Sequence, residues 1–384
     1  MPLALLVAAT VLAHSAYNGC RLTISLFALQ LGASPLTVGV LMSLFAALPM
    51  LLGVHAGRLV DRIGVRGPML AAVAGILAAV AVSAAFARLP VLFVTSTIAG
   101  TSFMLFHISV QHAVGQMGDA SARLSNFGWL ALGFSISNFV GPLFAGITID
   151  AAGHRSAFLL QAAFALASFG LLHRNRARLS HSTHRAAESA PRNARELLAN
   201  VELRRVFIVT GLLASAWDMF VFVTPIYGTS VGLSASTIGF ILASFATATI
   251  IVRLALPWLS RRMRDWSMIT ATLCIAFIAY LLFPMVRTVA LLAGIAFLLG
   301  LGLGATQPSI LSLIYAKAPQ GRAGEAVGVR SVVLATSSTV LPLGVGGVGA
   351  ALGMTPVFWS MAAALVAGGW FANRQRLESA RRGP

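Results

Sequence analysis

Residues 57–66 read Gly-Arg-Leu-Val-Asp-Arg-Ile-Gly-Val-Arg and stand between two long apolar runs, 36–56 and 68–87. This short stretch holds four charged side chains, in a chain of which only 10% of the residues are charged. A charged connection between membrane-length segments must lie in water, because the lipid interior cannot solvate it. The stretch therefore predicts a loop between two helices that cross a membrane.

The rest of the chain supports an all-α integral membrane protein. Its 384 residues are 58% hydrophobic, with a mean hydropathy of +0.87, which is more apolar surface than a water-soluble protein covers. A helix that spans a bilayer needs about 20 mostly apolar residues. Charged and turn-rich breaks divide the sequence into twelve such spans: 5–31, 36–56, 68–87, 90–115, 124–149, 155–173, 206–230, 235–258, 267–286, 289–315, 326–350 and 354–373.

The net charge of +17 indicates membrane topology and not a nucleic-acid partner. Lys and Arg gather in alternate loops, and only Arg88, Arg155 and Arg287 fall in loops on the opposite side. Cytoplasmic loops carry the positive excess in membrane proteins. Both termini and the long loop 174–205 are therefore predicted to be cytoplasmic, in an inner (plasma) membrane of bacterial type.

The sequence also aligns with itself when it is shifted by 200 residues. Two six-helix halves of equal length favour parallel repeats with a substrate cavity between them, near the middle of the membrane. The predicted domains are an N-terminal bundle 1–173, a cytoplasmic linker 174–205, a C-terminal bundle 206–373 and a cytoplasmic tail 374–384. The matched pairs include Gly32 with Gly232, Thr37 with Thr237, Phe45 with Phe245, Gly100 with Gly300 and Pro142 with Pro342.

With these features the chain resembles a transporter of the major facilitator superfamily, of the twelve-helix type. The signature loop of that family is matched by Gly57, Asp61, Arg62, Gly64 and Arg66, whereas Val65 replaces a usually basic residue. The resemblance implies a cytoplasmic gate in which the carboxylate of the signature accepts hydrogen bonds from the N-terminus of the eleventh helix. The alternative interpretation is a basic loop that only fixes topology.

A second motif is similar to the glycine-rich motif of drug:proton antiporters in the same superfamily. Gly141, Pro142 and Gly146 match it in the predicted span 124–149, but Ala145 replaces its other terminal glycine. Ser96 stands where many proton-coupled exporters carry an arginine, so the resemblance to antiporters is partial. Small residues at these positions also allow close packing of membrane helices.

Asp218 is the acidic residue that falls in the middle of a predicted span, where a charge costs about 2.5–3.5 kcal/mol. It aligns with Asn18 of the first span, and Arg21 lies on the same helical face as Asn18. We predict that Arg21 pairs with Asp218 and that loss and return of this partner change the proton affinity of the carboxylate. A static ion pair is the alternative.

Other polar side chains in the spans are candidates for the lining of the cavity, although each can equally satisfy a backbone carbonyl of a neighbouring turn. Arg253 and Arg330 lie near cytoplasmic helix ends and are expected to snorkel toward water. The cavity candidates are His14, Tyr17, His107, Gln111, Asn138, Gln161, Trp217 and Gln307.

The sequence therefore predicts a secondary transporter that moves a small organic solute by alternating access, with proton-coupled efflux as the first choice. Import of a small organic anion by proton symport is the second, and a membrane receptor or scaffold that transports nothing is the third. An enzyme is not expected, because the chain has no His-Glu-x-x-His and no phosphate-binding loop. His107 and His112 are five residues apart and diverge on a helix, so no metal and no cofactor are predicted. The expected partners are the solute, protons and the lipid bilayer, and a monomer is implied by the family resemblance.

Overall fold

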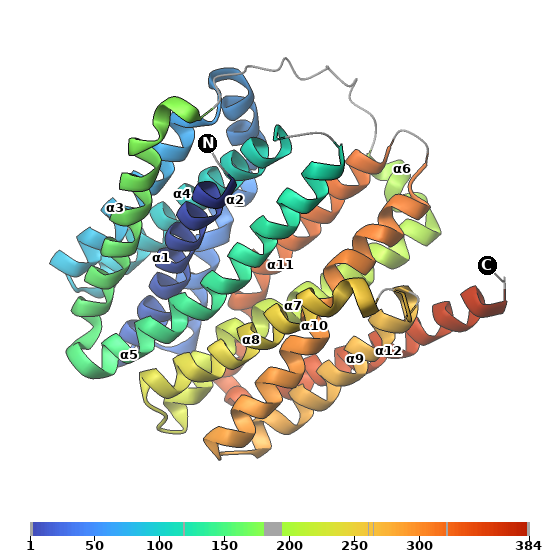
Figure 1. Cartoon of the computed structure of the whole chain (residues 1–384). Coiled ribbons are helices and arrows are strands. Elements are labelled where there is room, and N and C mark those ends of the chain that lie inside the picture. The colour runs from blue at the N-terminus through green and yellow to red at the C-terminus, as the bar shows by residue number, and fades with distance from the viewer. Residues whose placement is uncertain are drawn as a thin grey trace. The chain divides into compact units, whose positions relative to one another are not determined.

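The computed structural model describes residues 3–117, 120–179, 194–259, 261–263, 265–319 and 322–381. Every regular element in these ranges is a helix, as Figure 1 shows. The chain divides into two compact units, which are described separately. The first unit contains Met1–Glu188 with Pro225–Ala243, and the second contains Ser189–Thr224 with Ser244–Pro384.

The helices follow the apolar runs of the sequence. In the first half of the chain they are α1 (Leu3–Gln30), α2 (Pro35–Ile63), α3 (Arg66–Ala85), α4 (Leu89–Gly115), α5 (Ala120–Arg174) and the short 3-10 helix η1 (Arg176–Arg178). In the second half they are α6 (Ala194–Ala199), α7 (Val201–Ser230), α8 (Ala235–Leu259), α9 (Asp265–Leu282), the 3-10 helix η2 (Phe283–Met285), α10 (Val289–Lys317), α11 (Ala323–Leu352) and α12 (Met354–Arg381).

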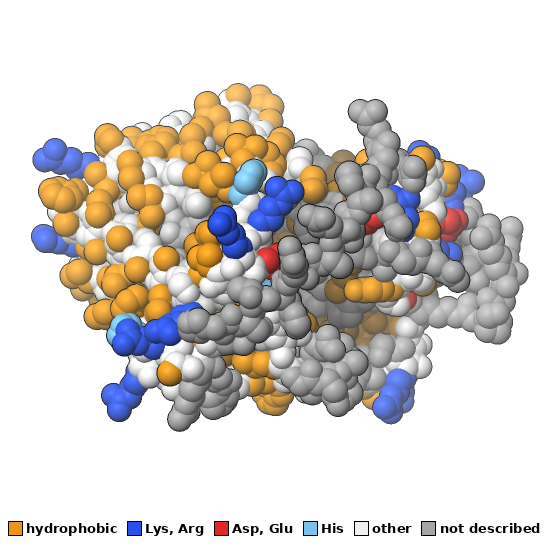
Figure 2. All heavy atoms as spheres, turned by 90° about the horizontal axis from the view of Figure 1, so that it is seen from above, with side chains coloured by type: hydrophobic (Ala, Val, Ile, Leu, Met, Phe, Trp, Pro, Cys, Tyr) orange, Lys and Arg blue, Asp and Glu red, His pale blue; other side chains and the backbone are white. Residues whose placement is uncertain are grey.

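Among the described residues, 11 helices are long and apolar enough to cross a membrane. The helix α5 covers two of the predicted spans, 124–149 and 155–173, and it is broken at Gly153, where φ is 80° and ψ is 171°. A positive φ suits glycine, because it lacks the Cβ that would clash with the backbone. Figure 2 shows one face of the molecule, where hydrophobic side chains make up most of the coloured surface and Lys and Arg stand in small groups.

The predicted loop 57–66 is shorter than the sequence suggested. Helix α2 continues through Asp61 to Ile63, and Gly64, with a φ of 77°, ends it. A helix of 29 residues is about 43 Å long, which exceeds the roughly 30 Å of hydrocarbon in a bilayer. The charged signature is therefore mostly an extension of the helix beyond the apolar span, and only its last residues form a turn.

The first unit is built around α1, which packs most extensively against α5. The contact depends on small residues, since a Cβ on Gly141 would lie 2.8 Å from the Ser15 carbonyl oxygen and one on Gly19 would lie 3.1 Å from the Gly141 carbonyl oxygen. Membrane helices approach closely where such residues face each other. Packing thus accounts for Gly141 of the antiporter-like motif.

The same motif ends in a second close contact within the first unit, between α5 and the first residues of α8. A Cβ on Gly146 would lie 2.3 Å from the Ala235 carbonyl oxygen, so the two backbones touch. Asp150, one turn further along α5, accepts hydrogen bonds from the backbone N–H groups of Ala235 at 3.0 Å and Ser236 at 2.7 Å. The carboxylate satisfies open donors at a helix N-terminus, where the helix dipole favours a negative charge.

Candidate functional site

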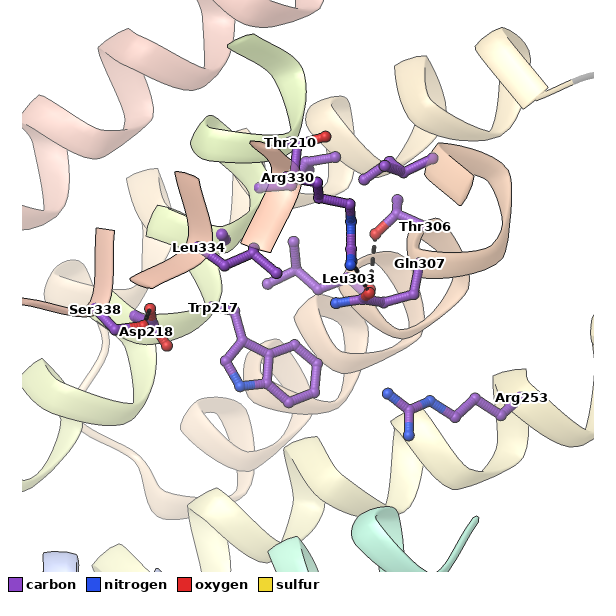
Figure 3. A pocket seen from close by; sticks show the side chains of 13 residues that line it. Thr210, Trp217, Asp218, Arg253, Leu303, Thr306, Gln307, Arg330, Leu334 and Ser338 are labelled. Carbon is purple, nitrogen blue, oxygen red and sulfur yellow. Dashed lines mark hydrogen bonds between the residues drawn. The ribbon is translucent and has the colours of Figure 1, made fainter. Parts of the chain in front are cut away.

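A cavity of about 220 Å³ lies inside the second unit, among α7, α8, α10 and α11 (Figure 3). It brings one carboxylate and two guanidinium groups into an otherwise apolar bundle, where ionised side chains are costly and usually functional. The polar side chains that line it are Thr210, Trp217 and Asp218 of α7, Arg253 of α8, Thr306 and Gln307 of α10, and Arg330 and Ser338 of α11.

Asp218 lies in the middle part of α7, as the sequence predicts. The Ser338 hydroxyl of α11 donates a hydrogen bond to Asp218 Oδ2 at 2.5 Å. The carboxylate is half-buried and borders the cavity, so it combines a fixed donor with access to whatever enters. The sequence analysis missed Ser338, although the offset of 200 residues aligns it with the candidate Asn138 and supplied the signal.

Arg330 does not snorkel to the end of its helix as expected. Its side chain lines the cavity, and the residue is only 9% exposed. One terminal nitrogen of the guanidinium donates to Gln307 Oε1, while Nε is buried and has no hydrogen-bond partner in the described part of the chain. Arg253 lines the same cavity from α8. Sequence position alone had assigned both arginines to the membrane surface.

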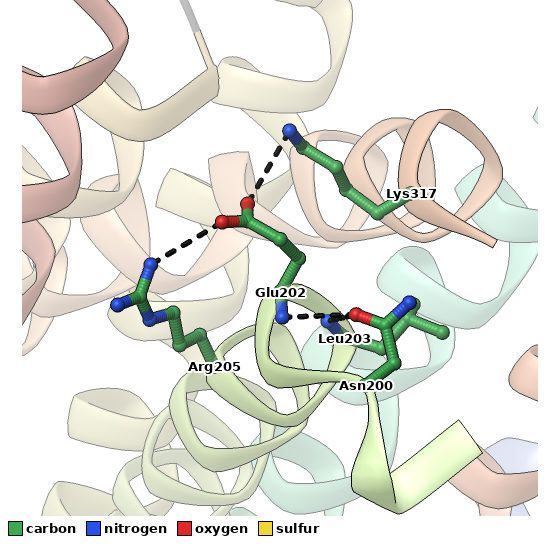
Figure 4. Close-up of polar contacts among 5 residues, drawn as sticks. All are labelled: Asn200, Glu202, Leu203, Arg205 and Lys317. Carbon is green, nitrogen blue, oxygen red and sulfur yellow. Dashed lines mark hydrogen bonds and ion pairs between the residues drawn. The ribbon is translucent and has the colours of Figure 1, made fainter. Parts of the chain in front are cut away.

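The carboxylate of Glu202 is engaged elsewhere in the second unit (Figure 4). It lies 3.3 Å from Arg205 Nη1 and 3.3 Å from Lys317 Nζ, which ties the start of α7 to the end of α10. The Asn200 side chain accepts hydrogen bonds from the N–H groups of Glu202 and Leu203 and caps α7. This cluster therefore positions a helix and takes no part in the cavity.

Glu325 is likewise engaged, because it pairs with Arg322 at 2.7 Å in the first turn of α11. None of the ion pairs found among the described residues of the second unit includes Arg330. The buried guanidinium thus lacks a carboxylate at ion-pair distance in that part of the chain.

A second polar cluster lies in the first unit, around Asn18 of α1. Asn18 Nδ2 donates to Asn138 Oδ1 of α5 at 2.8 Å and lies 3.1 Å from His14 Nε2. His14 Nδ1 lies 2.6 Å from Ser137 Oγ, which itself donates to the Gly133 carbonyl oxygen. Because the serine proton is used in that bond, the geometry suits a His14 that donates from Nδ1 and accepts at Nε2. The candidates His14, Asn18 and Asn138 therefore belong to one neutral, internally satisfied network.

An aromatic group covers this network. The ring of Phe103 stacks on Tyr17 at a centroid distance of 4.1 Å, and Tyr17 meets Phe45 edge to face at 5.5 Å. In the second unit, Trp217 meets Phe245 edge to face at 4.7 Å. The same pair of positions therefore carries an aromatic contact at both ends of the offset of 200 residues.

Arg21 lies next to these rings. Its guanidinium carbon is 5.9 Å from the ring centroids of both Tyr17 and Phe45, which is the range of a cation–π contact. Its Nε is buried and has no hydrogen-bond partner among the described residues. Arg21 and Asp218 belong to different units, so their pairing stays a prediction.

The signature residues lie at the end of α2, where Asp61 meets α4. Asp61 Oδ1 is 3.4 Å from His112 Nδ1, a contact that the sequence analysis did not anticipate. Arg62 is exposed, Arg66 is half-buried, and nothing lies within 4 Å of a Cβ placed on Gly57. Packing therefore gives no reason for glycine at position 57. The predicted bond from Asp61 to the N-terminus of the eleventh predicted helix stays a prediction.

The remaining candidates of the first unit serve its interior. Gln161 is 1% exposed and its Nε2 donates to Thr23 Oγ1 at 2.7 Å, which joins α5 to α1. Gln111 Nε2 lies 3.2 Å from His107 Nε2, one turn away on α4. In the case of Gln161 the structure supports a core residue that satisfies a neighbour more than a residue that lines a cavity.

Comparison with known proteins gives one family and one set of folds. The family model described as Major Facilitator Superfamily matches residues 6–342. A search of the curated proteins found no match.

Among the solved structures, a mutant of the peptide transporter POT in complex with sulfate has a TM-score of 0.82 to this chain at 15% sequence identity. The similarity covers 98% of this chain and 94% of that one. A POT family transporter in complex with 5-aminolevulinic acid has a TM-score of 0.79 at 14% identity, over 96% of this chain and 94% of that one. At this identity the similarity establishes the fold.

Proposed function

Since the chain belongs to the major facilitator superfamily, we propose that it is a proton-coupled secondary transporter of a small organic solute. Family and fold make it a multi-pass membrane transporter and not an enzyme. Coupling to protons, the direction of transport, the inner membrane, the cytoplasmic termini and the monomeric state are parts of the proposal. So is the arrangement of twelve spans in two repeats.

The observation that carries the proposal is the position of Asp218. It is a carboxylate in the middle part of α7, it borders a cavity, and it accepts a hydrogen bond from Ser338. A carboxylate that exchanges a proton needs a partner for its charged form and access to a proton or a competing cation. Ser338 supplies the first and the cavity supplies the second.

Transport by alternating access also needs contacts that form on one side and break on the other. In the proposed cycle, Asp61 and His112 belong to the cytoplasmic gate, and release of Asp150 from the N-terminus of α8 opens the opposite side. Both carboxylates lie at helix ends, outside the apolar middle of the spans. Arg21 is proposed to act on Asp218 in one of the two states, as the sequence analysis predicts.

The direction of transport has two candidates. Efflux is favoured by the partial antiporter motif, but packing against α1 and α8 already accounts for Gly141 and Gly146. Import of a small organic anion with protons is favoured by the two arginines that line the cavity. An accumulation and susceptibility screen of cells with and without the protein, against a broad panel of compounds, would decide between them.

The coupling proposal is tested by Asp218→Asn in proteoliposomes that contain a pH-sensitive dye. With solutes selected by that screen, the original chain should give a proton flux that depends on the solute. The variant should lose at least about tenfold of this flux, because its amide cannot exchange a proton. Asp265→Asn, at the N-terminal end of α9, is the matched control and should leave the flux unchanged. Equal coupling in Asp218→Asn would remove this residue from the mechanism, and no flux of any compound would favour a receptor.

A further inference from the structure

We infer that the cavity of the second unit holds the anionic group of a small solute between the Arg330 guanidinium and the Gln307 amide. This inference rests on the proposed function, and it adds the chemical class of the substrate and the residues that recognise it. It differs from the sequence-based expectation, in which Arg21 would receive an anion.

The first argument is the unused capacity of Arg330. A guanidinium has five N–H donors, and the described contact of Arg330 uses one terminal nitrogen, toward Gln307. Its Nε is buried and has no hydrogen-bond partner among the described residues. Buried polar groups are nearly always satisfied, so a donor of this kind at a cavity wall calls for a partner that enters the cavity.

The second argument is charge. Arg330 is 9% exposed, and a charge removed from water is costly unless an opposite charge meets it. The nearby acidic residues are committed in other ways: Glu202 pairs with Arg205 and Lys317, and Glu325 pairs with Arg322. The missing negative charge is therefore best supplied by a ligand.

The third argument is geometry. The Arg fork matches the two oxygens of a carboxylate or a phosphate, and such bidentate pairs are stronger than single neutral hydrogen bonds. Since Gln307 Oε1 accepts from Arg330, the amide NH₂ of Gln307 is turned the other way and can donate to the same ligand. Figure 3 shows these two side chains meeting at one wall of the cavity, with the indole of Trp217 beside them in that view.

The fourth argument is size and the surrounding charge. The cavity of about 220 Å³ is smaller than the roughly 300–1,000 Å³ of pockets that hold drug-sized ligands. It suits a compact metabolite better than a large amphipathic compound. Arg253 adds a second positive charge at the wall, so arginines outnumber the one carboxylate, Asp218, that lines the cavity.

The inference is tested on the purified full chain in detergent, with succinate and inorganic phosphate as probes. Thermal unfolding is followed at constant ionic strength while the probe replaces chloride, and succinamide serves as the uncharged analogue of succinate. We expect a saturable rise in Tm with succinate, phosphate or both, and none with succinamide, because only an anion supplies the missing charge. The more effective probe distinguishes a carboxylate site from a phosphate site.

The variant Arg330→Gln should weaken the apparent affinity for the effective probe at least tenfold, while Arg287→Gln, at an exposed arginine before α10, should behave as the original chain. If Arg330→Gln does not fold, Arg330→Lys keeps the charge and loses the fork, so it should show intermediate affinity. The absence of a saturable response in the original chain, or an equal response in both Arg330 variants, would overturn the inference.

The proposed function is judged separately, by solute flux in proteoliposomes. Flux of an uncharged solute without any binding of anions would reject the anion site and keep the transporter. Saturable binding of an anion through Arg330 without flux of any solute would do the reverse.

Discussion

The polar cluster of Asn18 and that of Asp218 are built at matching positions of the chain and differ in chemistry. Asn18 donates to Asn138 at 2.8 Å, and 200 residues later Asp218 accepts from Ser338 at 2.5 Å. The first cluster is neutral and is completed by His14. The second contains an ionisable group that borders a cavity. One arrangement of helices thus supports a structural network in one place and a site for exchange of charge in the other.

The scaffold around both clusters is the same to within small differences. A Cβ on Gly100 would lie 2.3 Å from the Phe45 carbonyl oxygen, and one on Gly300 would lie 2.2 Å from that of Phe245. The turns that precede α2 and α8 also match, with φ values of 78° at Gly32 and 79° at Gly232. The difference between the clusters therefore comes from a few polar side chains and not from the backbone.

The largest effect is expected from breaking this shared scaffold. Gly300→Ala places a methyl group against a backbone oxygen that cannot move away, and it should destabilise the protein by about 3 kcal/mol. Gly100→Ala should do the same. The measurement is the thermal unfolding of each purified variant.

Gly294→Ala is the control for this pair, because nothing lies within 4 Å of its added Cβ. It should be neutral or stabilising by up to about 1 kcal/mol, since alanine favours a helix over glycine. Equal stability of all three variants would show that the close contacts at Gly100 and Gly300 do not matter.

The next effect comes from making the first cluster resemble the second. Asn18→Asp puts a carboxylate in the first unit, where insertion of a charge costs about 2.5 kcal/mol, at the lower end of the usual range because His14 lies close enough to pair with it. Lower thermal stability, partly restored at a pH below 6 where the histidine binds a proton, is the expected result. A variant as stable as the original chain would mean that the two clusters tolerate charge equally.

The smallest effect is expected from Ser338→Ala, which removes the donor to Asp218. Loss of one hydrogen bond to a charged group should cost about 1.5 kcal/mol in stability and reduce proton-coupled flux only in part, because the carboxylate remains. Ser331→Ala, one exposed hydroxyl on the same helix that bonds its own backbone, is the control. A complete loss of coupling in Ser338→Ala would assign the serine a direct part in proton transfer.

Much of the fold was predictable because apolar runs and charge distribution are local properties of the sequence. The transmembrane class and the membership of the superfamily, read from residues 57–66, are confirmed. The extent of the signature loop was wrong, since a helix can extend beyond the membrane and no local signal marks where the bilayer ends. The antiporter subtype and efflux stay predictions.

The candidate site was predictable only in part. Asp218, Trp217 and Gln307 do line one cavity, and the exceptional position of an acid in an apolar span was enough to identify Asp218. Arg330 was assigned to the surface because its distance from the helix end permits snorkelling. Whether a long side chain turns to water or to the interior depends on which helices surround it, and sequence position does not contain that information.

The sequence by itself determined that this protein spans a membrane with paired halves of similar pattern and carries one acid deep in a span, because composition and spacing act within single helices. Tertiary structure alone decided that Asn18 joins a satisfied network while Asp218 shares a cavity with Arg330 and Gln307. The physical reason is that the free energy of a buried charge depends on its neighbours in space, and helices far apart in the chain supply those neighbours.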